Sequence, residues 1–302
     1  MEVSTANAPT SYERYLDIIT NALVCKKTMK VFLNDRMVDA DTIEDILEPG
    51  FLFGWGVFET LRVYDGTIVF LKEHLTRLND GCRKTSLIPP RVDVAQQIKT
   101  LLKENALRDA YCRISVFKKR ASTGITIYVS PFSYYQAADY QKGSTAIVSS
   151  FVRNSKHPLI SVKAISYLEN RLAWQKAQDK GKDEALFLNE KGYLTEGSRT
   201  NIFFIKNKTV YTPSLDCGML DGITRRKAIT VIKRKKIKLK EGAFQLNALL
   251  PCDEAFLTSS LMEVMPLVEV NGRPLGTGTP GAMTHLIHQG YQELIQRGRL
   301  RK

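Results

Sequence analysis

Alternating apolar and polar residues dominate the first part of the chain and predict a set of short strands. Successive side chains of a strand point to opposite faces of its sheet, so this alternation marks a strand with one buried face. The predicted strands cover residues 31–34, 37–38, 57–64, 67–71, 111–118 and 126–130. Asp65-Gly66 lies between two of them and is typical of a tight β-hairpin. Helices are predicted over 72–85 and 92–105.

In the second half of the chain the predicted strands interleave with helices. The strands cover 145–152, 201–205, 209–211, 254–258 and 268–270, and a hairpin over 184–193 turns at 189–192. Helices are predicted over 167–180, 225–235 and 282–296. Because strands outnumber helices but the two interleave, we predict an α+β fold rather than a doubly wound parallel sheet.

The same patterns divide the chain into domains. Residues 133–143 have no clear period and are interpreted as a linker between a small domain, residues 29–132, and a larger domain, residues 144–302. Residues 1–28 precede both, and apolar residues at helical spacing predict a short amphipathic helix over 11–24. This segment is either an accessory leader or lies ahead of a true start at Met29.

Composition narrows the class of protein. Of the 302 residues 43% are hydrophobic, which is ample for a buried core. The chain has no run of 18 uninterrupted apolar residues, and its start lacks the pattern of a secretory signal, so we predict no membrane contact. Five widely spread cysteines without a CxxC motif are typical of a reducing cytoplasm, where we place the protein. Cysteine and histidine spacing predicts no metal site.

The net charge of +13 raises the question of nucleic-acid binding. The densest basic runs are residues 233–240 and 297–302. In the first run lysines alternate with Ile237 and Leu239, so the lysines are predicted to face water and the apolar residues the interior. The second run ends a predicted helix, where cations suit the helix dipole. No aromatic interleaving accompanies either run, so we predict no specific nucleic-acid partner, with weak polyanion affinity as the alternative.

Two residues of the larger domain have the chemistry that a carbonyl cofactor requires. Lys163 has apolar neighbours on both sides, and desolvation lowers the pKa of an amine and favours Schiff-base formation. Glu196 precedes a small-residue turn between two strands and could keep a ring nitrogen protonated. The alternatives are a lysine that reaches solvent from an edge strand and a carboxylate that caps a turn.

Six ordered blocks give these two residues a context. They are GWGVFETLR at 54–62, EHLTRL at 73–78, KAISYL at 163–168, EGSRTN at 196–201, GITR at 222–225 and TSSLMEV at 258–264. Together they resemble the class IV, or fold type IV, pyridoxal-phosphate enzymes, which include branched-chain aminotransferases, D-amino-acid aminotransferases and aminodeoxychorismate lyases. The resemblance implies a smaller N-terminal α/β domain and a larger C-terminal domain with a mostly β core flanked by helices. It also implies an active site between the domains, near a homodimer interface.

The resemblance also implies which residues bind pyridoxal 5′-phosphate. Lys163 matches the lysine that carries the cofactor as a Schiff base and moves protons, and Glu196 matches the partner of the pyridine nitrogen. The expected phosphate contacts are Arg77, Ile223, Thr224, Ser259 and Ser260, and Tyr167 could approach the phenolic oxygen. Their alternative roles are a surface arginine, helix capping, strand-end serines and a core tyrosine. Arg199 stands where relatives often have a small hydroxylated residue, which argues against a phosphate role for it.

Four residues are candidates for substrate contacts. Tyr111 and Arg113 alternate on one predicted strand, so they share a face and could clamp a carboxylate. Phe53 and Phe58 flank glycines that leave room for a ligand, although a purely structural aromatic core explains them equally well. Neither carries the tyrosine hydroxyl that relatives often place at these positions.

We therefore predict a class IV aminotransferase that moves an amino group between an amino acid and a 2-oxo acid, with branched-chain amino acids among the candidates. An aminodeoxychorismate lyase, which releases pyruvate and 4-aminobenzoate, needs the same lysine, glutamate and phosphate contacts and remains the alternative. A basic, non-catalytic binding protein is a third reading. The joint presence of Lys163, Glu196 and Arg77 argues against it.

Overall fold

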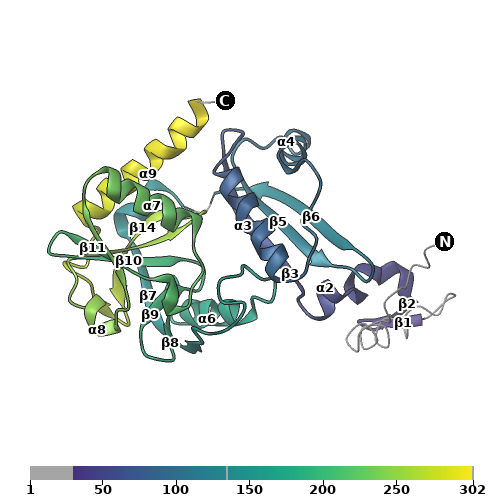
Figure 1. The fold of residues 1–302 in the computed structure, drawn as a ribbon, viewed down its shortest axis with the longest axis horizontal. Helices are drawn as coiled ribbons and strands as arrows, with labels where there is room; N and C mark the ends of the chain where they lie inside the picture. Colours follow the sequence, from purple (N-terminus) through teal and green to yellow (C-terminus); the bar gives the residue numbers. More distant parts are fainter. Residues whose placement is uncertain (1–29, 134, 301–302) are drawn as a thin grey trace, which may run out of the picture.

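The computed structural model describes residues 30–133 and 135–300. The helix predicted over 11–24 and the alternative start at Met29 lie outside the described residues. The described chain contains two sheet-based units joined by the segment around residue 135 (Figure 1), in agreement with the predicted α+β class. The domain boundaries 29–132, 133–143 and 144–302 stay predictions.

The first unit is a four-stranded antiparallel sheet covered on one face by two helices (Figure 1). Its order is β4 (Thr67–Ile68), β3 (Gly56–Tyr64), β5 (Ala110–Lys118) and β6 (Thr123–Pro131), and its helices are α3 (Leu71–Lys84) and α4 (Val94–Glu104). One face of β3 packs Val57, Leu61 and Val63 into the core under the helices. The other face of β3 is left for the second unit.

The strand predicted over 67–71 is shorter in the structure and gives way to α3. Phe70 has a left-handed backbone, with φ of +53°, and directly precedes the helix. A strand cannot continue through this conformation. Ahead of the sheet lie β1 (Lys30–Leu33), β2 (Arg36–Asp39), the 3-10 segment η1 (Ala40–Leu47) and α2 (Pro49–Leu52). The two hairpin strands were predicted, whereas η1 and α2 were not.

The second unit is a closed β-barrel. Its six strands are β7 (Ser144–Arg153), β8 (Glu184–Asn189), β9 (Leu194–Gly197), β10 (Asn201–Lys206), β13 (Glu254–Ser259) and β14 (Glu263–Val270). The ring closes because β10 pairs with both β13 and β9, through Asn201 opposite Glu196. Three further strands extend it: β11 (Thr209–Pro213), β12 (Lys238–Gly242) and β15 (Arg273–Pro274). The closed ring agrees with the mostly β core expected of the larger domain.

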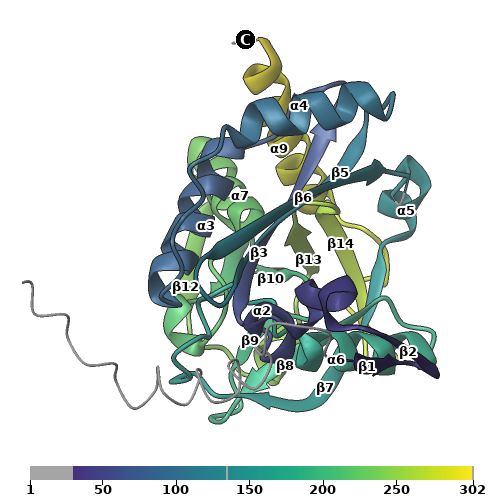
Figure 2. The same ribbon diagram turned by 90° about the vertical axis from the view of Figure 1, so that its right-hand side faces the viewer.

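Helices cover the outside of the barrel (Figure 2). They are α6 (Leu168–Asp179), α7 (Ile223–Arg234), α8 (Leu246–Leu249) and α9 (Ala282–Leu300), with the short 3-10 turn η2 (Leu215–Cys217). Outward-facing Phe203 and Phe256 stack at 4.7 Å and pack with Ile287 and Tyr291 of α9. Ala173 and Ala177 let α6 approach Phe187 on β8. Of the described helices, none is long and apolar enough to cross a membrane.

The segment predicted as a linker contains α5 (Ala137–Lys142). A capping box starts this helix: Gln136 and Asp139 each accept a hydrogen bond from the other's backbone. Six residues are too few to display a helical period, which explains why the sequence pattern did not predict it. The basic run is as expected, because Lys238 and Lys240 are exposed while Ile237 and Leu239 pack against the apolar cluster under α7 and α9.

Candidate active site

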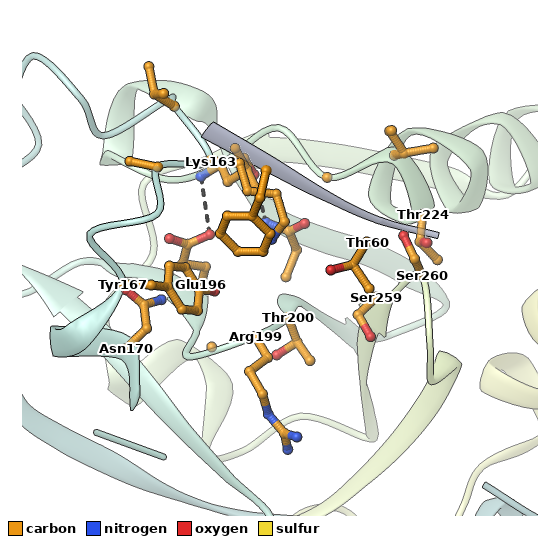
Figure 3. A pocket seen from close by; sticks show the side chains of 18 of the residues that line it. Thr60, Lys163, Tyr167, Asn170, Glu196, Arg199, Thr200, Thr224, Ser259 and Ser260 are labelled. Atoms are coloured by element: carbon orange, nitrogen blue, oxygen red, sulfur yellow. Dashed lines mark hydrogen bonds between the residues drawn. The ribbon is translucent and has the colours of Figure 1, made fainter. Parts of the chain in front are cut away.

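A cavity of about 600 Å³ lies between the four-stranded sheet and the barrel. Strands β3 and β5 contribute Phe58, Thr60, Tyr111 and Arg113 to its wall. The barrel side contributes the lining residues Lys163, Tyr167, Glu196, Ile223, Thr224, Thr258, Ser259 and Ser260. Figure 3 shows Lys163, Tyr167 and Glu196 on one side of the cavity, and Thr60, Thr224, Ser259 and Ser260 gathered on the other. The cavity therefore unites most of the predicted site residues.

Backbone hydrogen bonds hold Lys163 against β3. The Phe58 N–H donates to the Lys163 carbonyl at 2.9 Å, and the Ile165 N–H donates to the Gly56 carbonyl at 2.8 Å. Gly56 has no room for a side chain, because a Cβ there would lie 2.3 Å from Ile165 Cδ1 and 2.8 Å from the Val116 carbonyl oxygen. The position of the lysine thus depends on both units.

The environment of the Lys163 amine favours its neutral form. Nζ lies 4.4 Å from the centre of the Phe58 ring and 5.4 Å from that of the Tyr167 ring. Burial lowers the pKa of Lys163 to about 8, assisted by the positive charge of Arg77 and opposed by Glu59 and Glu196. A neutral amine is the form that attacks a carbonyl carbon or removes a proton.

Glu196 is a buried carboxylate at the end of β9. Its Oε2 accepts a hydrogen bond from the Leu220 N–H at 3.1 Å, and its Oε1 lies 3.7 Å from Arg153 Nη2. Burial raises the pKa of Glu196 to about 7, although Arg153, the Leu220 N–H and Lys163 act in the opposite direction. A cationic group placed against this carboxylate would keep it ionised.

Two residues that the sequence reasoning missed support Glu196 and its turn. Arg153, at the end of β7, donates to Asn170 Oδ1 at 2.9 Å, pairs with Glu169 and lies over the Phe187 ring. The fully buried Glu184 accepts hydrogen bonds from the Ser198 N–H and the Thr200 hydroxyl, both at 3.0 Å. Both residues lie at one end of a strand. The sequence did not show that they are buried, so nothing distinguished them from the many other charged residues of the chain.

The opposite end of the cavity has the donors of an anion site. Helix α7 begins at Ile223, and no side chain caps it because its N-cap is Gly222. Its first N–H groups therefore face the cavity without a capping acceptor. Thr258 Oγ1 is buried without a hydrogen-bond partner among the described residues, and the Ser259 and Ser260 side chains line the same end. These donors suit a phosphate group.

Arg77 of α3 reaches this end from the other unit. Its Nη1 donates to the Asp221 carbonyl at 3.0 Å, next to the start of α7. Its Nε and Nη2 both donate to Glu59 at 2.7 Å. Glu59 was missed, although a glutamate between Val57 and Leu61 on the inward face of a strand is an unusual position. Thr60, the next residue, was also missed and lines the cavity.

Two expected cofactor contacts, Tyr167 and Thr224, are engaged by other protein groups, and Arg199 points away from the anion site, as its residue type predicted. The Tyr167 hydroxyl donates to the Ser198 carbonyl at 2.7 Å, so its hydrogen is engaged by backbone rather than left for a cofactor oxygen. Thr224 lines the cavity, and its Oγ1 lies 3.5 Å from the Tyr291 hydroxyl. The Arg199 guanidinium lies over Trp174 and donates to the Asp183 carbonyl, turned away from Ser259 and Ser260 (Figure 3).

Of the four substrate candidates, three line the cavity. Tyr111 and Arg113 share one face of β5, as predicted, and the Arg113 guanidinium lies 3.8 Å from the centre of the Phe58 ring. Phe53 is different: it is 50% exposed and is not part of the cavity wall among the described residues. Gly54, at φ of +60° and against Ser166, turns the chain there and leaves Phe53 on the outer surface.

Comparison with known proteins agrees with this geometry. The family described as Amino-transferase class IV matches residues 56–270. A branched-chain-amino-acid aminotransferase of Pseudomonas aeruginosa is 33% identical over 84% of this chain and 89% of its own length. An aminodeoxychorismate lyase of Bacillus subtilis is 31% identical over 88% of this chain and 94% of its own length. A crystal structure of the T.th. branched-chain amino acid aminotransferase with pyridoxamine 5′-phosphate is 25% identical, with a TM-score of 0.78 over 90% of this chain and 95% of that one.

Proposed function

Because the chain belongs to the class IV aminotransferase family of pyridoxal-phosphate-dependent enzymes, we propose that it binds pyridoxal 5′-phosphate and transfers an amino group between an amino acid and a 2-oxo acid. One observation carries the proposal. Lys163, with a pKa near 8, and the buried Glu196 share a cavity whose far end holds hydroxyl groups and an uncapped helix start. An amine, a carboxylate and an anion site are the three contacts that this cofactor needs.

Different residues would bind different parts of the cofactor. Lys163 would hold it covalently through Nζ, and Glu196 would accept a hydrogen bond from its ring nitrogen. The phosphate would lie between Arg77, the first N–H groups of α7 at Ile223 and Thr224, and the hydroxyls of Ser259 and Ser260. When bound, the cofactor supplies a carbonyl carbon for an amine and a ring that withdraws electrons from it.

In the reaction Lys163 is the acid–base residue. In its neutral form Nζ would act as the base that removes the proton from the substrate Cα and, once protonated, as the acid that donates a proton, the two roles that transamination requires of this residue. Glu196, kept ionised by a neighbouring cation, would accept a hydrogen bond from the ring nitrogen and so favour its protonated form. Phe58 and Tyr167 wall this end of the cavity and restrict access of water to the amine.

Arg113 and Tyr111 are the proposed carboxylate contacts of the substrate. The Arg113 side chain donates to Ser115 Oγ at 3.2 Å and stacks on Phe58, which fixes its guanidinium at the cavity wall. Leu159 and Ile160 add apolar surface to the same cavity, which supports an aliphatic amino acid as donor. A branched-chain amino acid is therefore the first donor to test.

An aminodeoxychorismate lyase remains the second candidate. The run Thr-Ser-Ser-Leu-Met-Glu at 258–263 is closer to lyase-like sequences than to the branched-chain pattern. The lyase of Bacillus subtilis is about as similar to this chain as the aminotransferase is. Lys163, Glu196 and the anion site would serve both reactions, so only the product distinguishes them.

Absorption spectroscopy with pyridoxal 5′-phosphate tests the proposal. We expect a visible band that is lost on addition of L-leucine, L-glutamate or D-alanine, with release of the matching 2-oxo acid. A band that persists with all three, together with pyruvate release from aminodeoxychorismate, would favour the lyase.

Lys163→Ala should abolish both the band and turnover, whereas Lys142→Ala, on the surface of α5, should leave them unchanged. Full activity of Lys163→Ala would contradict the mechanism.

We also propose a homodimer and a cytoplasmic location, both of which stay predictions. The apolar side chains of Phe51, Leu52 and Phe53 on and after α2, and of Phe32 and Met37 on the first hairpin, are exposed and support an interface between two copies. The mass of the protein in solution, from light scattering, distinguishes a dimer from a monomer.

A further inference from the structure

Glu59 occupies a position where a charge is not expected. It lies on the face of β3 that packs Val57, Leu61 and Val63 into the core under α3 and α4. Its accessible surface is 0%. A carboxylate is retained in such a place only if other groups there stabilise its charge.

Two residues of α3 stabilise that charge. Arg77 donates to both oxygens of Glu59 at 2.7 Å, in a two-bond planar contact, and His74 Nδ1 lies 2.7 Å from Oε2. Burial alone would raise the pKa of Glu59, but Arg77 and His74 lower it to about 2. Burial lowers the pKa of His74, so the ring is neutral and its Nδ1–H donates to the ionised carboxylate.

The contact with Glu59 decides which donors of Arg77 remain for a ligand. A guanidinium has five N–H groups in one plane. Glu59 takes two of them and the Asp221 carbonyl takes a third, from Nη1. One N–H on Nη1 and one on Nη2 are left without an acceptor among the described residues. Because Asp221 immediately precedes the start of α7, the guanidinium is fixed beside the helix N–H groups that face the cavity.

We infer that Glu59 is a positioning residue, which orients Arg77 so that its two remaining N–H groups bind the phosphate of the cofactor. The inference rests on the proposed function, because that phosphate is the anion concerned. Glu59 also balances the charge of Arg77, so the pair attracts a phosphate through the direction of its N–H groups rather than through net charge. If net charge governed the affinity for phosphate, removal of Glu59 would increase it. If the orientation of Arg77 governs this affinity, removal of Glu59 decreases it.

Glu59→Gln tests the inference, because an amide keeps the volume but turns two N–H donors toward Arg77 and His74. We expect calorimetric titration of the cofactor-free protein to give a Kd for pyridoxal 5′-phosphate at least about tenfold higher than wild type. The Kd for pyridoxal, which lacks the phosphate, should stay within about twofold. Inorganic phosphate should likewise compete less well with pyridoxal 5′-phosphate.

Two further variants keep the test decisive. Glu59→Asp keeps the charge but shortens the side chain, so it should show the same selective loss, smaller in size, even if Glu59→Gln fails to fold. Asp80→Asn removes another carboxylate of α3, one that pairs with Arg83 of the same helix rather than with Arg77, and should change neither Kd.

An equal loss of affinity for pyridoxal and its phosphate would show a merely structural role for Glu59 and overturn the inference. An unchanged or tighter Kd for pyridoxal 5′-phosphate would overturn it too. If the wild-type protein binds pyridoxal 5′-phosphate no better than pyridoxal, the proposed function itself fails, and the inference fails with it.

Discussion

The two central residues of the site have pKa values shifted toward each other by the same cause. Burial lowers the pKa of Lys163 to about 8 and raises that of Glu196 to about 7. In both residues burial disfavours the charged form. The opposite charges of the two residues offset only part of the free energy that it costs to bury them. The cofactor-free site is therefore prepared for an amine reaction near neutral pH, but it reduces the stability of the fold there.

Glu196→Gln is consequently expected to stabilise the cofactor-free protein at pH 8. The folded-state pKa of Glu196 lies above the ordinary 4.5, so its contribution to stability is fully present below pH 4.5 and is lost as the pH rises through 7. The amide lacks this loss, so we expect the variant to gain about 1–3 kcal/mol at pH 8 and almost nothing at pH 4.5. Urea unfolding at the two pH values measures the difference.

The same substitution should lower kcat by about a hundredfold or more, because an amide cannot keep a ring nitrogen protonated. Glu104→Gln, an exposed residue at the end of α4, is the control and should change neither quantity. A variant that was no more stable than wild type at pH 8 would show that the carboxylate is solvated better than its burial indicates.

The sequence alone identified the site residues that match a known motif. It missed the residues whose role depends on being buried next to a distant partner. Lys163 and Glu196 belong to recognisable blocks, so both were found and both line the cavity. Glu59, although it lies in the block at 54–62, and Arg153 were missed because their roles depend on partners about 20 and 40 residues away, Arg77 and Glu196. Phe53 lies outside the cavity wall among the described residues, next to the left-handed Gly54, and its substrate role stays a prediction.

At the scale of elements, strand β3 is the part that connects the fold to the site. Its two faces serve different purposes: Val57, Glu59 and Leu61 face α3, whereas Phe58 and Thr60 line the cavity. The period of two along residues 57–64 was visible in sequence, and so the strand was predicted. The short helices α2 and α8, with four residues each, were missed because they complete about one turn and leave no period.

Gly56→Ala should damage the site through this strand. A Cβ at residue 56 would lie 2.8 Å from the Val116 carbonyl oxygen, in the neighbouring strand, and 2.3 Å from Ile165 Cδ1. Since the Val116 carbonyl oxygen is a backbone atom that cannot rotate away, β3 must shift relative to β5, and this shift disturbs the segment of Lys163 that is hydrogen-bonded to β3. We expect a loss of about 1–3 kcal/mol in unfolding free energy and a lower kcat.

Urea unfolding and steady-state kinetics measure these two effects. Gly298→Ala on α9, where a Cβ would meet nothing within 4 Å, is the matched control and should be neutral or slightly stabilising. If Gly56→Ala kept the wild-type kcat, the close packing of β3 at Gly56 would not be needed to position the lysine.

At the scale of the whole molecule, the site exists only while the sheet and the barrel stay together. Polar side chains that join the two units include Arg77 with the Asp221 carbonyl, Glu73 with Lys227, and Glu263 with Arg62 and Tyr64 of β3. The last is the most buried. Glu263 also bonds to His288 of α9 at 2.7 Å, so one carboxylate joins β3, β14 and α9. These pairings between distant segments could not be predicted from local periodicity.

Glu263→Gln should therefore loosen the two units from each other. An amide offers one acceptor oxygen where the carboxylate serves Arg62, Tyr64 and His288, and it leaves the partly buried charge of Arg62 without a negative charge beside it. We expect a loss of about 2–4 kcal/mol in unfolding free energy and a broader, two-step urea transition.

Glu269→Gln is the control, because Glu269 lies on the same strand but pairs with Lys182 inside the barrel unit. This variant should lose less unfolding free energy and unfold in as many steps as the wild type. Fluorescence and circular dichroism followed together decide the outcome: coincident single transitions in Glu263→Gln would mean that apolar packing, and not this carboxylate, holds the sheet against the barrel.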